Sequence, residues 1–128
     1  MAKKNNSPLE VWEQEQTFLW INSHKIHEPR LHLAYGTLNG VRLSVGLRLK
    51  MKRQGNRAGV PDIVLPAKSH CEKYPGLYIE LKRTKGGVVS KDQKEYMGLL
   101  KEEGYMVVVC KGHREAIDMI ISYFGNQF

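Results

Sequence analysis

The sequence predicts an α/β fold in which a mixed sheet of about four strands is flanked by helices. Two observations support this prediction. Short, nearly uncharged runs typical of strands stand between segments of helical periodicity, and turn residues separate the two kinds of segment. The predicted order is α-β-α-β-β-α-β-α. With 128 residues, the chain is long enough for one domain with a single core. We expect that domain to span 1–128, with 1–7 as a loose tail.

Two elements are predicted near the N-terminus. Ser7 is a suitable helix cap and Pro8 favours the first turn, so we expect a helix from here to about His24. The segment from Arg30 to Tyr35 alternates apolar and polar residues, which is typical of a strand, and turn residues follow it.

The middle of the chain predicts a helix and two strands. Apolar residues recur at helical spacing between Leu43 and Met51 and indicate a short basic helix that stops at Gly55. Two strands follow, over Asp62–Ala67 and Gly76–Lys82, and a polar loop joins them.

Three elements complete the prediction. Ser90 caps a helix that reaches Glu103, where a glycine follows. Tyr105–Cys110 contains no charge and predicts a buried central strand. The last helix covers about Arg114–Phe124.

The charge distribution favours a polyanionic partner. The formal net charge is +7 and the pI is near 9.5. Between Glu28 and Asp62 there is no acidic residue, and the basic ones there are Arg30, Arg42, Arg48, Lys50, Lys52, Arg53 and Arg57. Such a one-sign segment is typical of a nucleic-acid contact. The alternative is a solvated surface balanced elsewhere in the fold.

Several other classes of protein are disfavoured. No apolar run approaches the roughly 20 residues that span a bilayer, and the N-terminus lacks a signal-peptide pattern, so we expect a cytoplasmic protein without a membrane partner. The two cysteines and scattered histidines show no zinc-site spacing. We expect the aromatic residues Trp12, Trp20 and Tyr96 in the core.

One acid begins the first of the two middle strands, and an acid and a lysine end the second. Glu80 and Lys82 are two residues apart and share one face of a strand, while Leu77, Ile79 and Leu81 take the core face. In a hairpin, Asp62 would approach Glu80. Two adjacent carboxylates repel unless a cation lies between them, and Mg²⁺ or Mn²⁺ prefers such oxygen ligands. A solvated Glu-Lys pair is the alternative.

This constellation resembles the PD-(D/E)XK nuclease superfamily, and in particular its virus-type replication-repair nuclease domain, VRR-NUC. The resemblance extends from about Pro8 to Phe124. Its matching pieces are Pro8-Leu9-Glu10 with Gln14, Asn39-Gly40, Gly55 to Asp62, Tyr78 to Lys82, Ser90 to Gln93, and Gly104-Tyr105.

The resemblance implies a restriction-endonuclease-like core and a Mg²⁺- or Mn²⁺-dependent endonuclease. Asp62, Glu80 and a glutamate of the N-terminal helix would bind metal with the backbone carbonyl of Leu81. Lys82 would assist the nucleophilic water. Gln93 would orient it, and its alternative role is a capping box with the serine at the helix start.

Among these residue assignments, that of the helix glutamate follows least directly from the family pattern. Glu10 precedes Gln14 by four residues, as the family pattern requires, and both share one stripe of the helix. Glu13 and Glu15 compete with it for the same role.

The resemblance also implies DNA as substrate, in particular branched DNA such as four-way junctions, and a homodimer. Residues expected to contact phosphates are Arg42, Arg48, Lys50, Lys52, Arg53, Arg57 and Lys85. Two other readings stay open: a DNA-binding module without catalysis, and a restriction-type enzyme that reads a short sequence.

Overall fold

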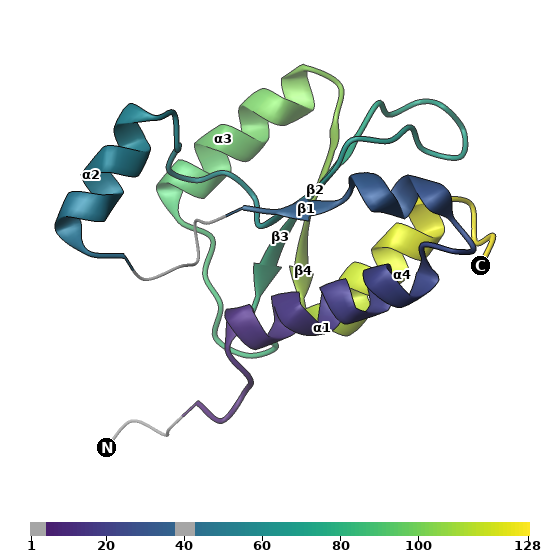
Figure 1. Cartoon of the computed structure of the whole chain (residues 1–128), viewed down its shortest axis with the longest axis horizontal. Helices are drawn as coiled ribbons and strands as arrows, with labels where there is room; N and C mark the ends of the chain where they lie inside the picture. Colours follow the sequence, from purple (N-terminus) through teal and green to yellow (C-terminus); the bar gives the residue numbers. More distant parts are fainter. Residues whose placement is uncertain (1–4, 38–42) are drawn as a thin grey trace.

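The structure is a computed structural model that describes residues 5–37 and 43–128. Asn39-Gly40 and Arg42 of the sequence predictions lie outside the described residues. The elements, labelled in Figure 1, are α1 (Glu10–His24), a 3-10 helix η1 (Pro29–Leu33), β1 (Tyr35–Gly36), α2 (Val45–Arg53), β2 (Ile63–Leu65), β3 (Leu77–Lys82), α3 (Lys91–Glu102), β4 (Met106–Lys111) and α4 (Gly112–Tyr123).

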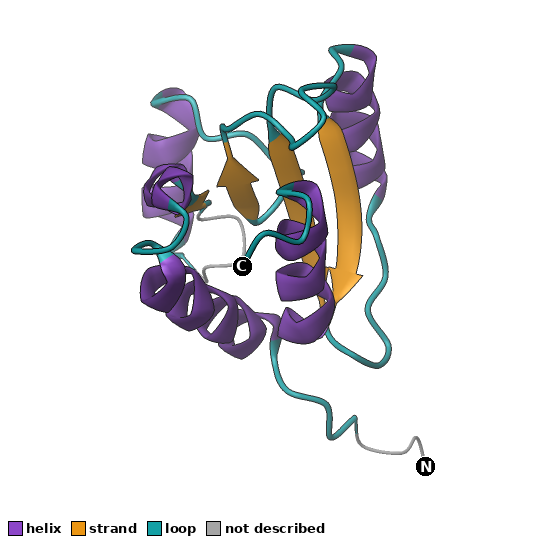
Figure 2. Cartoon of the chain, turned by 90° about the vertical axis from the view of Figure 1, so that its right-hand side faces the viewer, coloured by secondary structure: helices purple, strands orange, loops and turns teal. Residues whose placement is uncertain are grey.

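The strands form one mixed sheet in the order β1-β2-β3-β4. Strand β2 pairs antiparallel with both β1 and β3, and β3 pairs parallel with β4. Helices α1 and α4 pack together on one side of the sheet and α3 lies on the other (Figures 1 and 2). The predicted α/β class and mixed sheet are confirmed for the described residues.

The core lies between the sheet and the α1–α4 pair. Leu77, Ile79 and Leu81 of β3 are fully buried, as their alternation predicted, and they pack with Ile21 of α1 and Ile120 of α4. Because the core takes this face of β3, the side chains of the alternate positions are directed to the side of the sheet where α3 lies. In the described part of the chain, no helix has the length and apolar character needed to cross a bilayer.

The prediction of a strand over Arg30–Tyr35 is wrong for most of this range. Pro29 opens the 3-10 helix, and the carboxylate of Glu28 caps it by accepting the amide of Arg30 at 3.2 Å. A proline at the first position and an acid just before it favour a helical turn. The apolar alternation is not a buried face, since Leu31 is buried but Leu33 is 50% exposed.

The strand expected at the centre of the sheet lies at its edge. Strand β4 pairs only with β3 among the described strands, and Val109 is 40% exposed. The uncharged run Tyr105–Cys110 is only partly buried, since Val107 and Cys110 are buried while Val109 is exposed, and the strand ends at the exposed Lys111.

Two predicted helix starts also differ. The N-cap of α1 is Leu9 rather than Ser7, whose hydroxyl instead contacts Asn5 and the carbonyl of Lys85. Residues 5–7 of the expected loose tail are therefore held in place. Helix α4 begins at Gly112, slightly before the predicted Arg114.

Two further predictions concern exposure. Trp12 is 43% exposed, so its expected place in the core is wrong, whereas Trp20 and Tyr96 are half-buried. Helix α2 contains no buried residue and stands apart from the body of the molecule (Figure 1). Its cap is Ser44, which accepts the amide of Leu47.

Candidate active site

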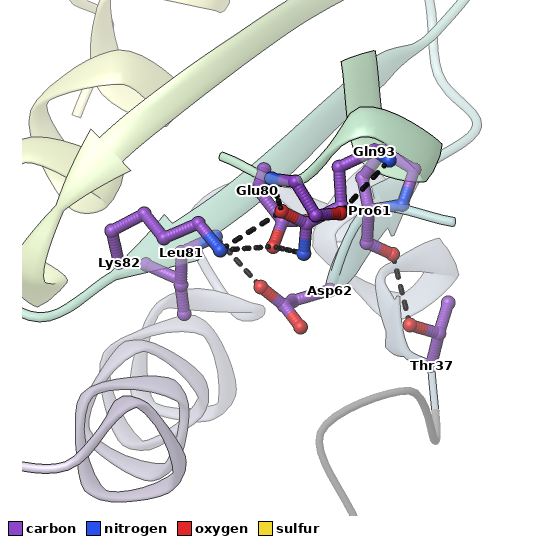
Figure 3. A network of polar contacts seen from close by, with 8 residues as sticks. Thr37, Pro61, Asp62, Glu80, Leu81, Lys82 and Gln93 are labelled. Atoms are coloured by element: carbon purple, nitrogen blue, oxygen red, sulfur yellow. Dashed lines mark hydrogen bonds and ion pairs between the residues drawn. The ribbon is translucent and has the colours of Figure 1, made fainter. Parts of the chain in front are cut away.

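Two carboxylates meet at the end of the β2–β3 hairpin. Ile63 pairs with Ile79, so the antiparallel register continues to place Asp62 across from Glu80. Both acids are buried, at 7% and 1% exposure. Oδ2 of Asp62 accepts the amide of Leu81 at 2.7 Å, which ties the first acid directly to the strand that supplies the second (Figure 3).

The backbone around Asp62 is fixed from the neighbouring strand. Thr37 follows β1, and its amide donates to the carbonyl of Asp62 at 2.8 Å while its hydroxyl donates to the carbonyl of Pro61 at 2.9 Å (Figure 3). Gln14 of α1 lies on the same carbonyl, with Nε2 3.4 Å away. The chain ahead of β2 is thus held from two sides, which positions the carboxylate.

Glu80 has one satisfied and one unsatisfied oxygen. Oε1 accepts from Nε2 of Gln93 at 2.8 Å and lies 3.5 Å from Nζ of Lys82. Oε2 is the one buried side-chain nitrogen or oxygen without a hydrogen-bond partner among the described residues. Burial, and then the charge of Asp62, raise the pKa of Glu80 to about 8. Burial likewise raises the pKa of Asp62.

An orphaned buried carboxylate oxygen normally indicates a missing partner. The donor set here consists of carboxylate oxygens, which suit a hard divalent cation such as Mg²⁺ or Mn²⁺. The residues present therefore fit such an ion at Asp62 and Glu80.

Lys82 is buried at 5% exposure, an unusual position for a lysine. Its Nζ donates to Oε1 of Gln93 at 3.0 Å (Figure 3). The loop after β3 covers its aliphatic stem so closely that a Cβ on Gly87 would lie 2.7 Å from Cβ of Lys82. A residue larger than glycine there would press on the lysine.

Gln93 forms the capping box that the sequence offered as its alternative role, and its side chain also contacts two residues of the site. It forms a capping box with Ser90, whose hydroxyl accepts the Gln93 amide at 3.2 Å and whose amide donates to Oε1 of Gln93 at 2.9 Å. The same side chain contacts Lys82 through Oε1 and Glu80 through Nε2. The start of α3 is therefore built into the site.

Gly59 allows the segment ahead of Asp62 to pass under α3. Its φ of +85° is left-handed, and an added Cβ would lie 2.4 Å from the carbonyl oxygen of Asp92. Both features require glycine. This contact fixes the distance between the chain that leads to Asp62 and the helix turn that holds Gln93.

The three competing glutamates of α1 point to different places. Glu10 lines a cleft of about 230 Å³ together with Gln14 and Asp62, and its charge contributes to the raised pKa of Asp62. Glu13 is buried and contacts His113 at the start of α4, with 2.9 Å between Oε2 and Nδ1. Glu15 lines a different, apolar cleft.

Geometry therefore favours Glu10 over its two rivals. In the described residues, however, no three acids, histidines or cysteines come close enough to form a metal cluster. The place of Glu10 as a third ligand stays a prediction.

One residue of the cleft was not singled out from the sequence. Arg83 directly follows β3 and lines the same cleft as Asp62 and Glu10. Its position directly after Lys82 was the one feature of the sequence that could have identified it. An arginine just beyond a strand is common, however, and does not by itself indicate a functional site.

The residues expected to contact DNA lie outside this cluster. All of the described ones are exposed: Arg48, Lys50, Lys52 and Arg53 on α2, Arg57 after it, and Lys85 in the loop after β3. Arg42 is not described. The helix that holds four of them, α2, stands apart from the strands of the sheet in Figure 1.

The comparison with known families agrees with this geometry. A family model of the VRR-NUC domain matches residues 6–114. The chain belongs to the VRR-NUC family. A solved structure described as a VRR_NUC domain protein is similar to it, with a TM-score of 0.75 and 28% sequence identity over 92% of this chain and 89% of that one. Comparison with curated proteins gives no match.

Membership in the VRR-NUC family gives the chain a nuclease-type function, with DNA as the corresponding partner. The match includes every residue of the cluster at the end of β2 and β3. The mixed sheet with helices on both faces agrees with the restriction-endonuclease-like core implied by the motifs.

Proposed function

We propose that this chain is a Mg²⁺- or Mn²⁺-dependent endonuclease that hydrolyses phosphodiester bonds in DNA. One observation supports this proposal above the others. Glu80 keeps a buried carboxylate oxygen without a partner, directly across the hairpin from a second buried acid, Asp62. Two buried acids in this arrangement do not serve a protein that only binds DNA, because their negative charges repel the phosphates and the charge of Asp62 raises the pKa of Glu80.

The ion would be held by Asp62 and Glu80. The backbone carbonyl oxygen of Leu81 is the proposed third ligand of the ion. The N–H and C=O groups of one strand residue point to the same side, and the N–H of Leu81 points to Asp62. Glu10 is the fourth. When bound, a divalent cation polarises the phosphate and lowers the pKa of a bound water.

The remaining polar residues orient the reactants. Lys82 is held by Gln93 next to Glu80, so its ammonium can donate to the attacking water or to a phosphate oxygen. Gln93 donates to Oε1 of Glu80 and so leaves Oε2 for the ion. Burial of Asp62, Glu80 and Lys82 limits the access of bulk water and strengthens the interactions that these side chains make.

Branched DNA, in particular a four-way junction, is the proposed substrate, and a homodimer is the proposed assembly. Both rest on the resemblance to stand-alone VRR-NUC proteins of phage and bacterial type. The apolar residues of α2, with Val45 64%, Leu47 45% and Leu49 53% exposed, offer surface that a second copy could cover. A two-fold dimer would present two equivalent sites to a symmetric junction. Light scattering of the purified protein tests the dimer.

The decisive experiment compares cleavage of labelled four-way junction, flap and linear duplex with Mg²⁺ or Mn²⁺. Wild type should cut the junction best, Asp62→Ala should be inactive, and Asp118→Asn, an exposed acid on α4, should match wild type. Equal products from wild type and Asp62→Ala would overturn the proposal. Ca²⁺ should support binding without cleavage, whereas for a pure binder the identity of the metal would not matter.

A further inference from the structure

Arg83 lies at the edge of the proposed catalytic site without forming part of the acid and lysine cluster. It follows the last residue of β3 and is half-buried. The cleft that it lines has Asp62 and Glu10 on its walls, and Arg83 is the basic residue among the described residues lining it.

Three hydrogen bonds engage one side of its guanidinium. Nε donates to the hydroxyl of Ser7 at 3.1 Å, and Nη2 donates to the carbonyls of Asn5 at 3.2 Å and of Ser7. Within the described residues, no hydrogen bond or ion pair engages Nη1. The N-terminal segment therefore fixes the arginine on one edge and leaves another donor available.

A DNA phosphate that enters this cleft requires a positive charge to offset the repulsion of the acids that line it. Lys82 is buried and already donates to Gln93, and the acids around the cleft repel a phosphate. An arginine held by neutral acceptors keeps its full charge, because neither carbonyls nor a hydroxyl neutralise it. Guanidinium groups bind phosphate through charge-assisted hydrogen bonds of defined geometry.

We propose that Arg83 binds a phosphate of the DNA strand that is cut, and that residues 5–7 hold its guanidinium in position for this contact. This inference rests on the proposed nuclease function and adds a substrate-binding residue to it. The contact is with the backbone, so it positions the strand without reading its sequence.

The rival role is purely structural, with Arg83 as an anchor for the N-terminal segment. The two roles are separated by comparing Arg83→Gln with the double variant Asn5→Ala/Ser7→Ala. The double variant removes the side chains that tie the segment to Arg83 and Lys85 but keeps the arginine. Arg83→Lys tests whether the charge alone is sufficient, and Lys101→Gln, an exposed charge in the last turn of α3, controls for net charge.

The measurements are kcat and KM on the junction with Mg²⁺, and the salt dependence of DNA binding in Ca²⁺. Arg83→Gln should raise KM about tenfold or more, the size of a lost charge-assisted hydrogen bond, and lower the log–log salt slope by about 0.9, one phosphate contact. Arg83→Lys should recover part of the loss. Lys101→Gln should keep KM within about twofold. The double variant should raise KM less than Arg83→Gln does, because it removes the Ser7 hydroxyl but keeps both backbone carbonyls that accept from Nη2.

Equal effects of Arg83→Gln and the double variant would overturn the proposal and leave the anchor role. An unchanged KM and salt slope in Arg83→Gln would overturn it too. If wild type cuts no DNA, the nuclease proposal fails, while the salt slopes in Ca²⁺ still decide whether Arg83 contacts a phosphate. Should Arg83→Gln not fold, KM is compared between Arg83→Lys and the double variant, because only the lysine variant loses the guanidinium geometry. A KM of Arg83→Lys no higher than that of the double variant would then overturn the proposal.

Discussion

The side-chain amide of Gln93 donates to Oε1 of Glu80 at 2.8 Å, from the first turn of α3 to the strand that supplies the second acid. The same turn is closed by the capping box between Gln93 and Ser90. The start of the helix and the geometry of the site therefore depend on one side chain, and the two contributions can be separated by substitution.

Gln93→Glu should keep the helix start and impair cleavage. Glutamate fills the third position of a capping box as well as glutamine does, but it replaces the donor to Glu80 with a second carboxylate. We expect a loss of at least about tenfold in kcat, in line with other positioned polar groups. Ser90→Ala is the matched control, because it should cost about 1 kcal/mol of stability and leave kcat near wild type. A lower kcat for Ser90→Ala together with a wild-type kcat for Gln93→Glu would contradict this separation of the helix start from the catalytic site.

The stability of the metal-free protein should fall as pH rises from about 5 to about 8. The pKa of Glu80 is raised from its ordinary value of 4.5 to about 8, so across this window the folded state holds a proton that the unfolded chain has released. Stability declines with pH wherever the folded state binds more protons.

Thermal unfolding in the presence of a chelator measures this decline, which we expect to lower Tm by at least about 5 °C. Glu80→Gln is the control, since it removes the titrating group and should flatten the profile. A Tm that rises over this range in wild type would show that Glu80 is already ionised in the folded, metal-free protein.

Sequence reasoning found the hairpin because its signals are local. Asp62, Glu80 and Lys82 stand at the ends of two short uncharged runs, and a two-residue step on a strand fixes which side chains share a face. The antiparallel register could not be read, yet a short polar loop between two strands made a hairpin the simplest connection.

Features that depend on contacts distant in the chain could not be found in this way. The proposed role of Arg83 depends on a contact with Ser7, which is 76 residues away in the chain. Glu13 could not be separated from Glu10 before α4 was placed next to α1. The 3-10 turn after Pro29 showed strand-like alternation, and only the exposure of Leu33 reveals that this alternation has no buried face.

Addition of Mg²⁺ or Mn²⁺ should stabilise wild type and not the Asp62→Asn variant. A ligand at a hundred times its Kd stabilises the folded state by about 2.7 kcal/mol, and an ion also supplies the missing partner of Glu80 Oε2. Removal of the metal with a chelator should reverse the shift. Thermal unfolding and calorimetric titration are the measurements, and the same shift in both proteins would place the ion elsewhere.

The three glutamates of α1 should give three different phenotypes. Glu10→Gln should lower cleavage at least about tenfold with an unchanged Tm, because Glu10 lines the cleft beside Asp62. Glu13→Gln should lower stability by about 1–3 kcal/mol, because its buried carboxylate accepts from the backbone and ring of His113 at the start of α4. Glu15→Gln should change neither quantity. A Glu15→Gln variant with impaired cleavage and normal Tm would transfer the proposed role from Glu10 to Glu15.

The basic residues of α2 should contribute to DNA affinity and little to folding. None of the residues of this helix is buried, so replacement of Arg48, Lys50, Lys52 and Arg53 by glutamine removes charge without removing packing. Each phosphate contact that is lost should lower the log–log slope of binding against salt by about 0.9, and kcat at saturating DNA should stay near wild type. Salt titrations of binding in Ca²⁺ provide the slope, with Lys101→Gln as a single-charge control away from α2. If the variant with all four substitutions has the salt slope of wild type, α2 does not contact the phosphates. The exposed apolar residues of α2 would then favour a contact with another protein chain.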